Sequence, residues 1–210
     1  MNSRAVAVLV QGAVSVAAPP GVDAGALRAA LAEDTYELVA DLAEVDVLVA
    51  TCPPDQPDID DMVWPQTKIF GVSAGDGPGE LRDVLAELAG DGYLAAVVVA
   101  ADAPDLPGLL VGKLFRGLAR AEVAVCPAEA GGLVAFAATL PLAAWLHELD
   151  VGLDTVDALA RLRAAAPDRR ALSVAPGWHR IRTPADIARL DPGLEGWMST
   201  RALLSAPRSG

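Results

Sequence analysis

The stretch LAAVVVAADAPDLP, residues 94–107, decides the fold class of this chain. Its first eight residues are all apolar, and the run ends at Asp102, which begins an acidic loop with two prolines. A short apolar run bounded by such breakers is typical of a strand that is buried on both faces of a parallel sheet. Ligands bind beyond the carboxyl ends of the strands in such sheets, so this loop is the first candidate for a site.

Strand-like and helix-like segments alternate on both sides of this stretch. Compact apolar runs predict further strands at 5–10, 45–51, 68–72, 123–126, 133–137 and 171–175, and an extended segment at 179–182. Helical spacing and helix-starting residues predict helices at 24–43, 109–119, 141–148 and 155–165, one that ends near residue 89 and one that begins at 183–186 with Thr183 as its cap.

This alternation predicts an α/β fold. We expect a three-layer α/β/α sandwich with a mainly parallel sheet, because helices that connect parallel strands must cover both faces. A length of 210 residues suits one such domain, which we place at residues 1–195, followed by a C-terminal tail at 196–210.

Composition and charge exclude several classes of protein. Hydrophobic residues make up 53% of the chain and aromatic residues 4%, so the core must consist of alanine, valine and leucine. The net charge of −12 argues against nucleic-acid or membrane partners. The charge is uneven, because residues 1–160 hold 7 basic and 24 acidic side chains and residues 161–210 hold 9 basic and 4 acidic ones. Two distant cysteines, Cys52 and Cys126, form no disulfide framework, which predicts a reducing, cytoplasmic location.

The acidic loop after residue 101 suggests chemistry with phosphates. A carboxylate such as Asp102 could hold Mg²⁺ or Mn²⁺ that bridges a diphosphate, or it could simply end the strand. Asp105 could serve the same site or cap the helix that follows. No G-x-G-x-x-G motif follows the first strand, so a dinucleotide-binding oxidoreductase is not expected.

Two longer segments resemble a known family. Residues 97–141, VVVAADAPDLPGLLVGKLFRGLARAEVAVCPAEAGGLVAFAATLP, contain a match to the S-D-x-P-D-L motif and a later glycine pair. Residues 175–190, APGWHRIRTPADIARL, resemble a D-x-D-T-P-A-D-L ending. Both motifs are similar to those of GT-A-like bacterial glycosyltransferase-like proteins, of the nucleotide-diphospho-sugar transferase superfamily. That family is related to molybdenum-cofactor guanylyltransferase and 2-phospho-L-lactate guanylyltransferase.

The resemblance implies roles for particular residues. Asp102 matches the family's metal-binding aspartate, and Asp105 matches the second aspartate of that motif. Gly131 and Gly132 match a turn against the acceptor or sugar. Backbone amides near Gly12, and those of the glycine-rich turn that contains Gly75 and Gly77, would receive phosphates.

Three departures from the family pattern remove charges that phosphate chemistry uses. The loop at residues 11–21 has no lysine or arginine, where active relatives have a basic loop. Ala130 replaces the acid before the glycine pair. Arg180 and Arg182 replace two aspartates, one of which helps to hold the metal. Because the two arginines are two apart on an extended segment, they project on the same side. They could bind a phosphate or carboxylate directly, or form a salt bridge with Asp102.

Two functions therefore remain open. One is a divergent GT-A-like nucleotidyl- or glycosyl-transferase homologue that binds a nucleotide or nucleotide-sugar, with impaired catalysis. The other is a non-catalytic scaffold or sensor that retains the fold, with homo-oligomerisation as an option.

Overall fold

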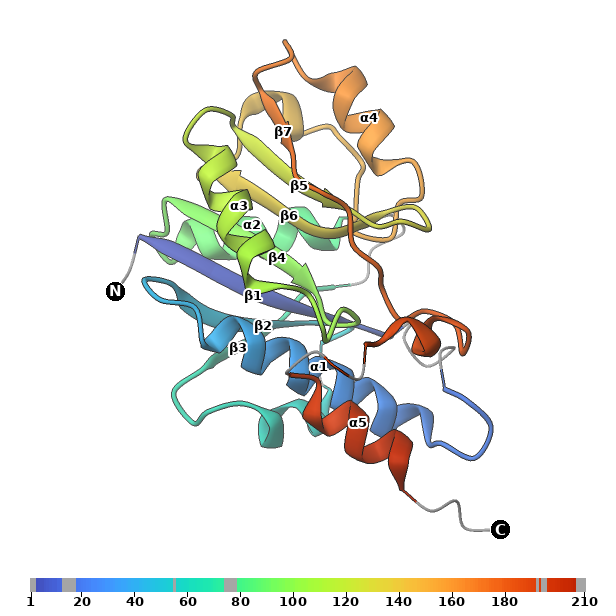
Figure 1. Ribbon diagram of the computed structural model, residues 1–210. Helices are drawn as coiled ribbons and strands as arrows, with labels where there is room; N and C mark the ends of the chain where they lie inside the picture. The colour runs from blue at the N-terminus through green and yellow to red at the C-terminus, as the bar shows by residue number, and fades with distance from the viewer. Residues whose placement is uncertain are drawn as a thin grey trace.

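A seven-stranded sheet lies at the centre of the computed structural model, which describes residues 3–12, 18–54, 56–73, 79–191, 193 and 196–206. The strands are β1 (Arg4–Gln11), β2 (Asp46–Cys52), β3 (Lys68–Gly71), β4 (Ala95–Ala100), β5 (Val123–Pro127), β6 (Leu133–Thr139) and β7 (Leu172–Val174). Their order in the sheet is β3-β2-β1-β4-β6-β5-β7 (Figure 1). Only β6 runs antiparallel to its neighbours among these strands. The mainly parallel sheet is confirmed.

Helices cover both faces of the sheet. On one face lie α1 (Ala24–Ala40) and α3 (Gly108–Leu118), and on the other lie α2 (Glu80–Gly90) and α4 (Ala158–Ala165) (Figure 1). The predicted three-layer α/β/α sandwich is confirmed. No helix in the described ranges has both the length and the apolar character that crossing a membrane requires.

The core follows the alternation of side chains along the strands. In β1, Ala5, Ala7 and Leu9 pack toward α2 and α4, whereas Val6 and Val8 pack toward α1 and α3. Successive residues of a strand point to opposite faces, so a strand between two helical layers must be apolar at every position. This is the physical reason for the continuous apolar runs in the sequence.

A third cluster ties the C-terminal segment to α1. Leu27 and Leu31 of α1 pack with Ile181, Leu190 and Trp197. The helix α5 (Met198–Ser205) then lies beside α1 (Figure 1).

The first turn of α5 is capped from another element. The carboxylate of Asp34, in α1, accepts hydrogen bonds from Ser199 N at 2.9 Å and Thr200 N at 2.8 Å. Burial raises the pKa of Asp34, although these hydrogen bonds act in the opposite direction. A carboxylate from α1 thus serves amides that the helix itself cannot satisfy.

Three predicted elements differ in the structure. The helix expected at 141–148 is a short 3-10 helix, η3 (Ala144–Leu146), and the one expected at 183–186 is another, η4 (Asp186–Arg189). Thr183 does not cap it. Instead the Asp186 carboxylate accepts from Thr183 N and Oγ1, at 2.8 and 2.9 Å. Segments this short have little helical stability of their own, so tertiary packing decides their form.

Residues 179–182 form no strand. A single bridge joins Trp178 to Ala128, and the chain then crosses over the carboxyl ends of the central strands. Ile181 N donates to Asp102 O at 2.7 Å, which places this segment against the end of β4.

Candidate functional site

The candidate site lies where the strand order reverses, between β1 and β4. From these neighbouring strands the chain continues toward opposite edges of the sheet, to β2 on one side and to β5 on the other. Such a reversal places a crevice at the carboxyl ends of the two strands. Asp102 lies two residues past the end of β4, where the sequence predicted the start of a loop, and is 2% exposed.

Arg180 donates hydrogen bonds to both carboxylate oxygens of Asp102. Its Nε donates to Asp102 Oδ1 at 2.5 Å and its Nη2 donates to Oδ2 at 2.9 Å. Arg182 Nε lies 3.6 Å from the same Oδ2. Two parallel hydrogen bonds between a guanidinium and a carboxylate form the strongest ion-pair geometry in proteins. The predicted alternative of a salt bridge between these arginines and Asp102 is confirmed.

A second carboxylate completes this centre. Asp154 Oδ1 accepts from Arg180 Nη1 at 2.8 Å and also from Arg182 Nη2. Arg180 Nη1 further donates to the carbonyls of Leu133 and Leu153, at 3.1 and 3.3 Å. Burial alone would lower the pKa of Arg180, but the carboxylates of Asp102 and Asp154 raise it above its ordinary value. Arg180 is therefore a fully paired, permanently charged group inside the protein.

This arrangement does not fit a divalent metal at Asp102. Mg²⁺ and Mn²⁺ need several free oxygen ligands, whereas two guanidinium groups already face this carboxylate. The described residues also contain no group of three or more His, Cys, Asp or Glu side chains that could hold a metal ion. The metal role predicted for Asp102 conflicts with its surroundings. Arg180 likewise has little left to offer a phosphate, because its Nε and Nη1 N–H groups and one of the two on Nη2 bond to protein oxygens.

Asp105 faces inward, toward the C-terminal segment. Trp178 Nε1 donates to Asp105 Oδ1 at 3.1 Å. His179 Nε2 lies 3.0 Å from Asp105 Oδ2, but the two atoms are not aligned as a hydrogen bond. The helix α3 begins after Pro107 and has no side-chain cap, so the predicted alternative of a capping role for Asp105 is wrong.

The glycine pair has a backbone role in the structure. Gly131 and Gly132 have φ of +96° and +81°, a conformation that L side chains rarely adopt. A Cβ on Gly132 would lie 2.5 Å from Leu153 O. Gly132 N also donates to Val156 O at 3.1 Å. The glycines thus let the turn after β5 pack closely against the segment that carries Asp154.

The neighbouring end of β1 carries no positive charge of its own. Gln11 Nε2 donates to Glu80 Oε1 at 3.2 Å, and Glu80 is the first residue of α2. Burial raises the pKa of Glu80, and the negative charges of Asp154, Asp150 and Asp83 raise it further. Gly12 follows Gln11, and among the described residues a Cβ there would approach Pro53 Cδ, at 4.0 Å. The predicted phosphate-binding glycines Gly75 and Gly77 lie outside the described residues.

Asp154 and Trp178 were missed by sequence reasoning. Asp154 lies in an irregular segment with no motif, and its role follows only from the turn that packs beneath it. Trp178 lies just before the arginine pair in the sequence. Its indole N–H could have been found as a signal, because a tryptophan that packs against the protein generally needs an acceptor for this group.

No protein-family model matches this sequence, and no curated protein matches it significantly. Solved structures do match. A candidate nucleotide-diphospho-sugar transferase from Desulfovibrio desulfuricans G20 is 21% identical, with a TM-score of 0.73 over 97% of this chain and 94% of that chain. The 4-diphosphocytidyl-2C-methyl-D-erythritol synthase of Anaerococcus prevotii is 13% identical, with a TM-score of 0.62 over 89% and 93%.

A third match is the manganese complex of Rv0371c from Mycobacterium tuberculosis, which is 14% identical, with a TM-score of 0.60 over 92% of this chain and 100% of that chain. These three likenesses each cover 89% or more of this chain. The chain therefore has the GT-A-type fold of the nucleotide-diphospho-sugar transferases and their nucleotidyltransferase relatives.

Proposed function

We propose that this chain is a divergent homologue of nucleotidyl- and glycosyl-transferases that lacks metal-dependent transfer and works as a non-catalytic scaffold or sensor. The observation that carries the proposal is the bidentate pairing of Arg180 with Asp102, at 2.5 and 2.9 Å. In the family that this sequence resembles, the carboxylate at this position holds the metal. Here a guanidinium takes the place that the metal would need.

Electrostatics support this exclusion. A divalent ion bound at Asp102 would face the Arg180 guanidinium, which already bonds to both oxygens of that carboxylate. Charges of +2 and +1 that are about 5 Å apart repel by roughly 7 kcal/mol at an effective dielectric constant of about 20. Moving Arg180 away would also leave its charge without the partners that it has in the buried site. Metal binding therefore competes against an ion pair that is already formed.

The charge of the centre also disfavours a triphosphate. Two carboxylates, from Asp102 and Asp154, face two guanidiniums, from Arg180 and Arg182, and the negative charge of Asp154 also acts on nearby Glu80. The Arg182 side chain is 32% exposed, but it is paired with Asp154. A triphosphate needs an excess of positive charge. We infer that any nucleotide or nucleotide-sugar binds weakly and without a metal.

A thermal-shift titration tests this proposal. Purified protein is mixed with Mn²⁺ alone, and with GTP, CTP, UDP-glucose or GDP-mannose, each with and without Mn²⁺. We expect no stabilisation that depends on Mn²⁺ and no transfer of nucleotide or sugar. A ligand at 100 times its Kd would add about 2.7 kcal/mol, which such a measurement detects easily. A Mn²⁺-dependent shift that Asp102→Asn abolishes would contradict the proposal.

A variant sharpens the test. Arg180→Asp with Arg182→Asp restores carboxylates at the two positions where the related family has them. We expect this double variant to be destabilised without metal, because three or more carboxylates then meet, and to be restabilised by Mn²⁺. Arg161→Asp, in an exposed ion pair on α4, serves as the control and should not respond to Mn²⁺. If the double variant ignores Mn²⁺, the arginines are not what excludes the metal.

An active transferase is the second candidate. It is favoured by the near-complete structural match to a candidate nucleotide-diphospho-sugar transferase and by the manganese complex of Rv0371c. In that case a nucleotide or nucleotide-sugar and Mg²⁺ or Mn²⁺ would have to displace both arginines from Asp102. The titration above separates the two candidates. We further propose a cytoplasmic location, because Cys52 and Cys126 are both free and buried. Homo-oligomerisation is a separate proposal, which light scattering on the purified protein tests.

A further inference from the structure

The strand β7 leaves one edge of the sheet open. It is the last strand in the sheet order and pairs only with β5 among the described strands. Ala171 O accepts from Val123 N at 3.1 Å, and Ala175 N donates to Val125 O at 2.8 Å. Backbone polar groups alternate in direction along a strand, so those of Leu172 and Val174 face away from β5. Val174 is 41% exposed, which leaves both its backbone and its side chain accessible.

Two hollows flank this open edge, one on each face. A hollow of about 850 Å³ lies between β7 and α3, and we call it the α3-side hollow. A second hollow of about 400 Å³ lies toward α4, and we call it the α4-side hollow. Leu172 and Val174 line both hollows. Side chains of a strand added to this edge would point alternately to the two faces, and would therefore enter the two hollows in turn.

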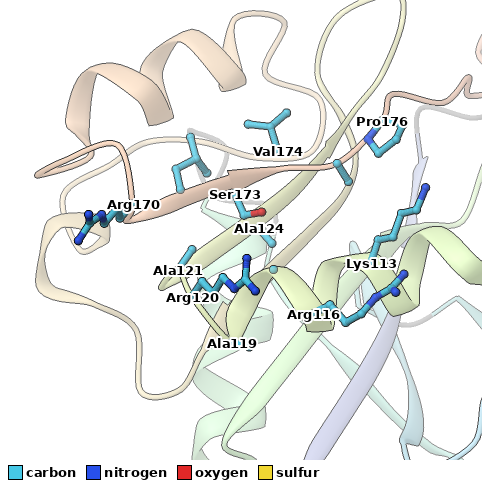
Figure 2. A pocket seen from close by; sticks show the side chains of 13 residues that line it. Lys113, Arg116, Ala119, Arg120, Ala121, Ala124, Arg170, Ser173, Val174 and Pro176 are labelled. Atoms are coloured by element: carbon cyan, nitrogen blue, oxygen red, sulfur yellow. The ribbon is translucent and has the colours of Figure 1, made fainter.

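The α3-side hollow is strongly basic. Lys113, Arg116 and Arg120 reach it from α3 and the turn after it, and Arg170 reaches it from the segment before β7 (Figure 2). No acidic residue among those that the structure describes lines this hollow. None of the four cationic side chains has an ion pair or hydrogen bond to any residue within the described ranges. In a chain with a net charge of −12, such a group of unpaired cations indicates an anionic partner.

We propose that the β7 edge is a docking site for an extended acidic peptide segment of another protein. The peptide adds a strand beside Leu172 and Val174, with acidic side chains in the α3-side hollow. Its other side chains enter the α4-side hollow, whose lining combines the apolar Leu172, Val174 and Ala166 with the charged Arg163, Asp168 and Arg169. Main-chain hydrogen bonds supply affinity in this mode, and the hollows select the side chains.

The charges argue against the two other occupants. A second copy of this chain, paired edge to edge, would bring the same arginines together, and like charges in facing positions are destabilising. A small anion would use the cations but not the strand edge.

The test uses a defined probe, a blocked seven-residue peptide of alternating glutamate and valine, and measures binding to the full chain by calorimetry. We expect a Kd tighter than about 1 mM at low salt, weakening as salt rises. The same peptide with lysine in place of glutamate should not bind. Inorganic pyrophosphate is the competitor that represents a small-anion site, and it should displace the peptide only weakly.

Two variants separate the contributions of charge and strand pairing. Arg116→Gln with Arg120→Gln should weaken peptide binding about tenfold, or about 1.4 kcal/mol. The control, Arg161→Gln with Arg189→Gln, carries the same net charge but alters arginines outside the α3-side hollow, and should bind as the wild type does. Val174→Pro removes only an outward N–H, which an edge strand tolerates, and should also weaken binding at least tenfold.

Other results overturn the proposal. Unchanged binding by a folded Val174→Pro variant would mean that no strand is added. Tight pyrophosphate binding that depends on Arg116 and Arg120 but not on Val174 would assign the hollow to small anions instead. Absence of peptide binding up to about 1 mM would leave the cations only as a guard against edge-to-edge aggregation.

Discussion

Two groups of arginines lie in this molecule, in opposite electrostatic states. Arg180 is buried, and its guanidinium bonds to Asp102, Asp154 and two carbonyls. Arg116 and Arg120 line an open hollow and have no partner among the described residues. A buried charge must be paired to be tolerated, whereas a solvated charge remains available to a ligand. The Asp102 centre is therefore closed by its own charges, whereas the cations beside β7 remain accessible.

The largest expected effect is the loss of Arg180. Arg180→Leu leaves Asp102 buried without its main partner, which should lower the free energy of unfolding by about 3–5 kcal/mol. Urea denaturation measures this loss. Adding Asp102→Leu should recover much of it, because no uncompensated charge then remains. A single-variant loss below about 1 kcal/mol would mean that the centre is not held by this pair.

Gly132→Ala tests the support beneath the same centre. The new Cβ would meet Leu153 O at 2.5 Å, and φ at this residue is +81°. We expect a loss of about 1–3 kcal/mol in unfolding free energy, from backbone strain and from displacement of the segment that holds Asp154. Gly112→Ala on α3 is the matched control, since a Cβ there meets nothing within 4 Å. Equal effects of the two substitutions would contradict a supporting role for the turn.

Glu80→Gln should produce a smaller effect that depends on pH. The folded pKa of Glu80 is raised, by burial first and then by Asp154, so the folded protein retains a proton that the unfolded chain releases. Stability contributed by this residue therefore falls as pH rises from the unfolded value, near 4.3, through the folded value. The variant should be more stable than wild type at pH 7 and equal to it below about pH 4. Thermal unfolding across pH checks this, and a stabilisation independent of pH would refute the assignment.

The smallest stability effect is expected at the β7 edge. Arg116→Gln with Arg120→Gln should change the unfolding free energy by less than about 0.5 kcal/mol, because neither side chain has a partner to lose. The same variant should nevertheless weaken binding of the acidic peptide. Urea denaturation and calorimetry on one preparation measure both quantities. A large loss of unfolding free energy would mean that these arginines stabilise the fold, as Arg180 does, and are not free to bind a partner.

Sequence reasoning predicted most of the fold and about half of the site. Continuous apolar runs such as the one that ends before Asp102 predicted the buried strands, because only a strand covered on both faces needs that pattern. The short elements at 141–148 and 183–186 were wrong in type, since their form depends on packing and not on local propensity. A salt bridge between Asp102 and the arginine pair was one of two predicted alternatives, and the ion pairs of Asp154 had no local signal in the sequence.

What the sequence determined by itself was the three-layer α/β architecture, the position of Asp102 at a strand end, and the absence of lysine and arginine from the loop at residues 11–21. These properties follow from periodicity and composition, which are local. Only the tertiary structure decided that Arg180 neutralises Asp102, that Asp154 shares both arginines, and that four cations line one hollow beside β7. The reason is physical. The strength of an ion pair depends on the distance between its two charges. Arg180 and Asp102 are 78 residues apart in the chain, so their distance in space follows from the fold and not from local sequence spacing.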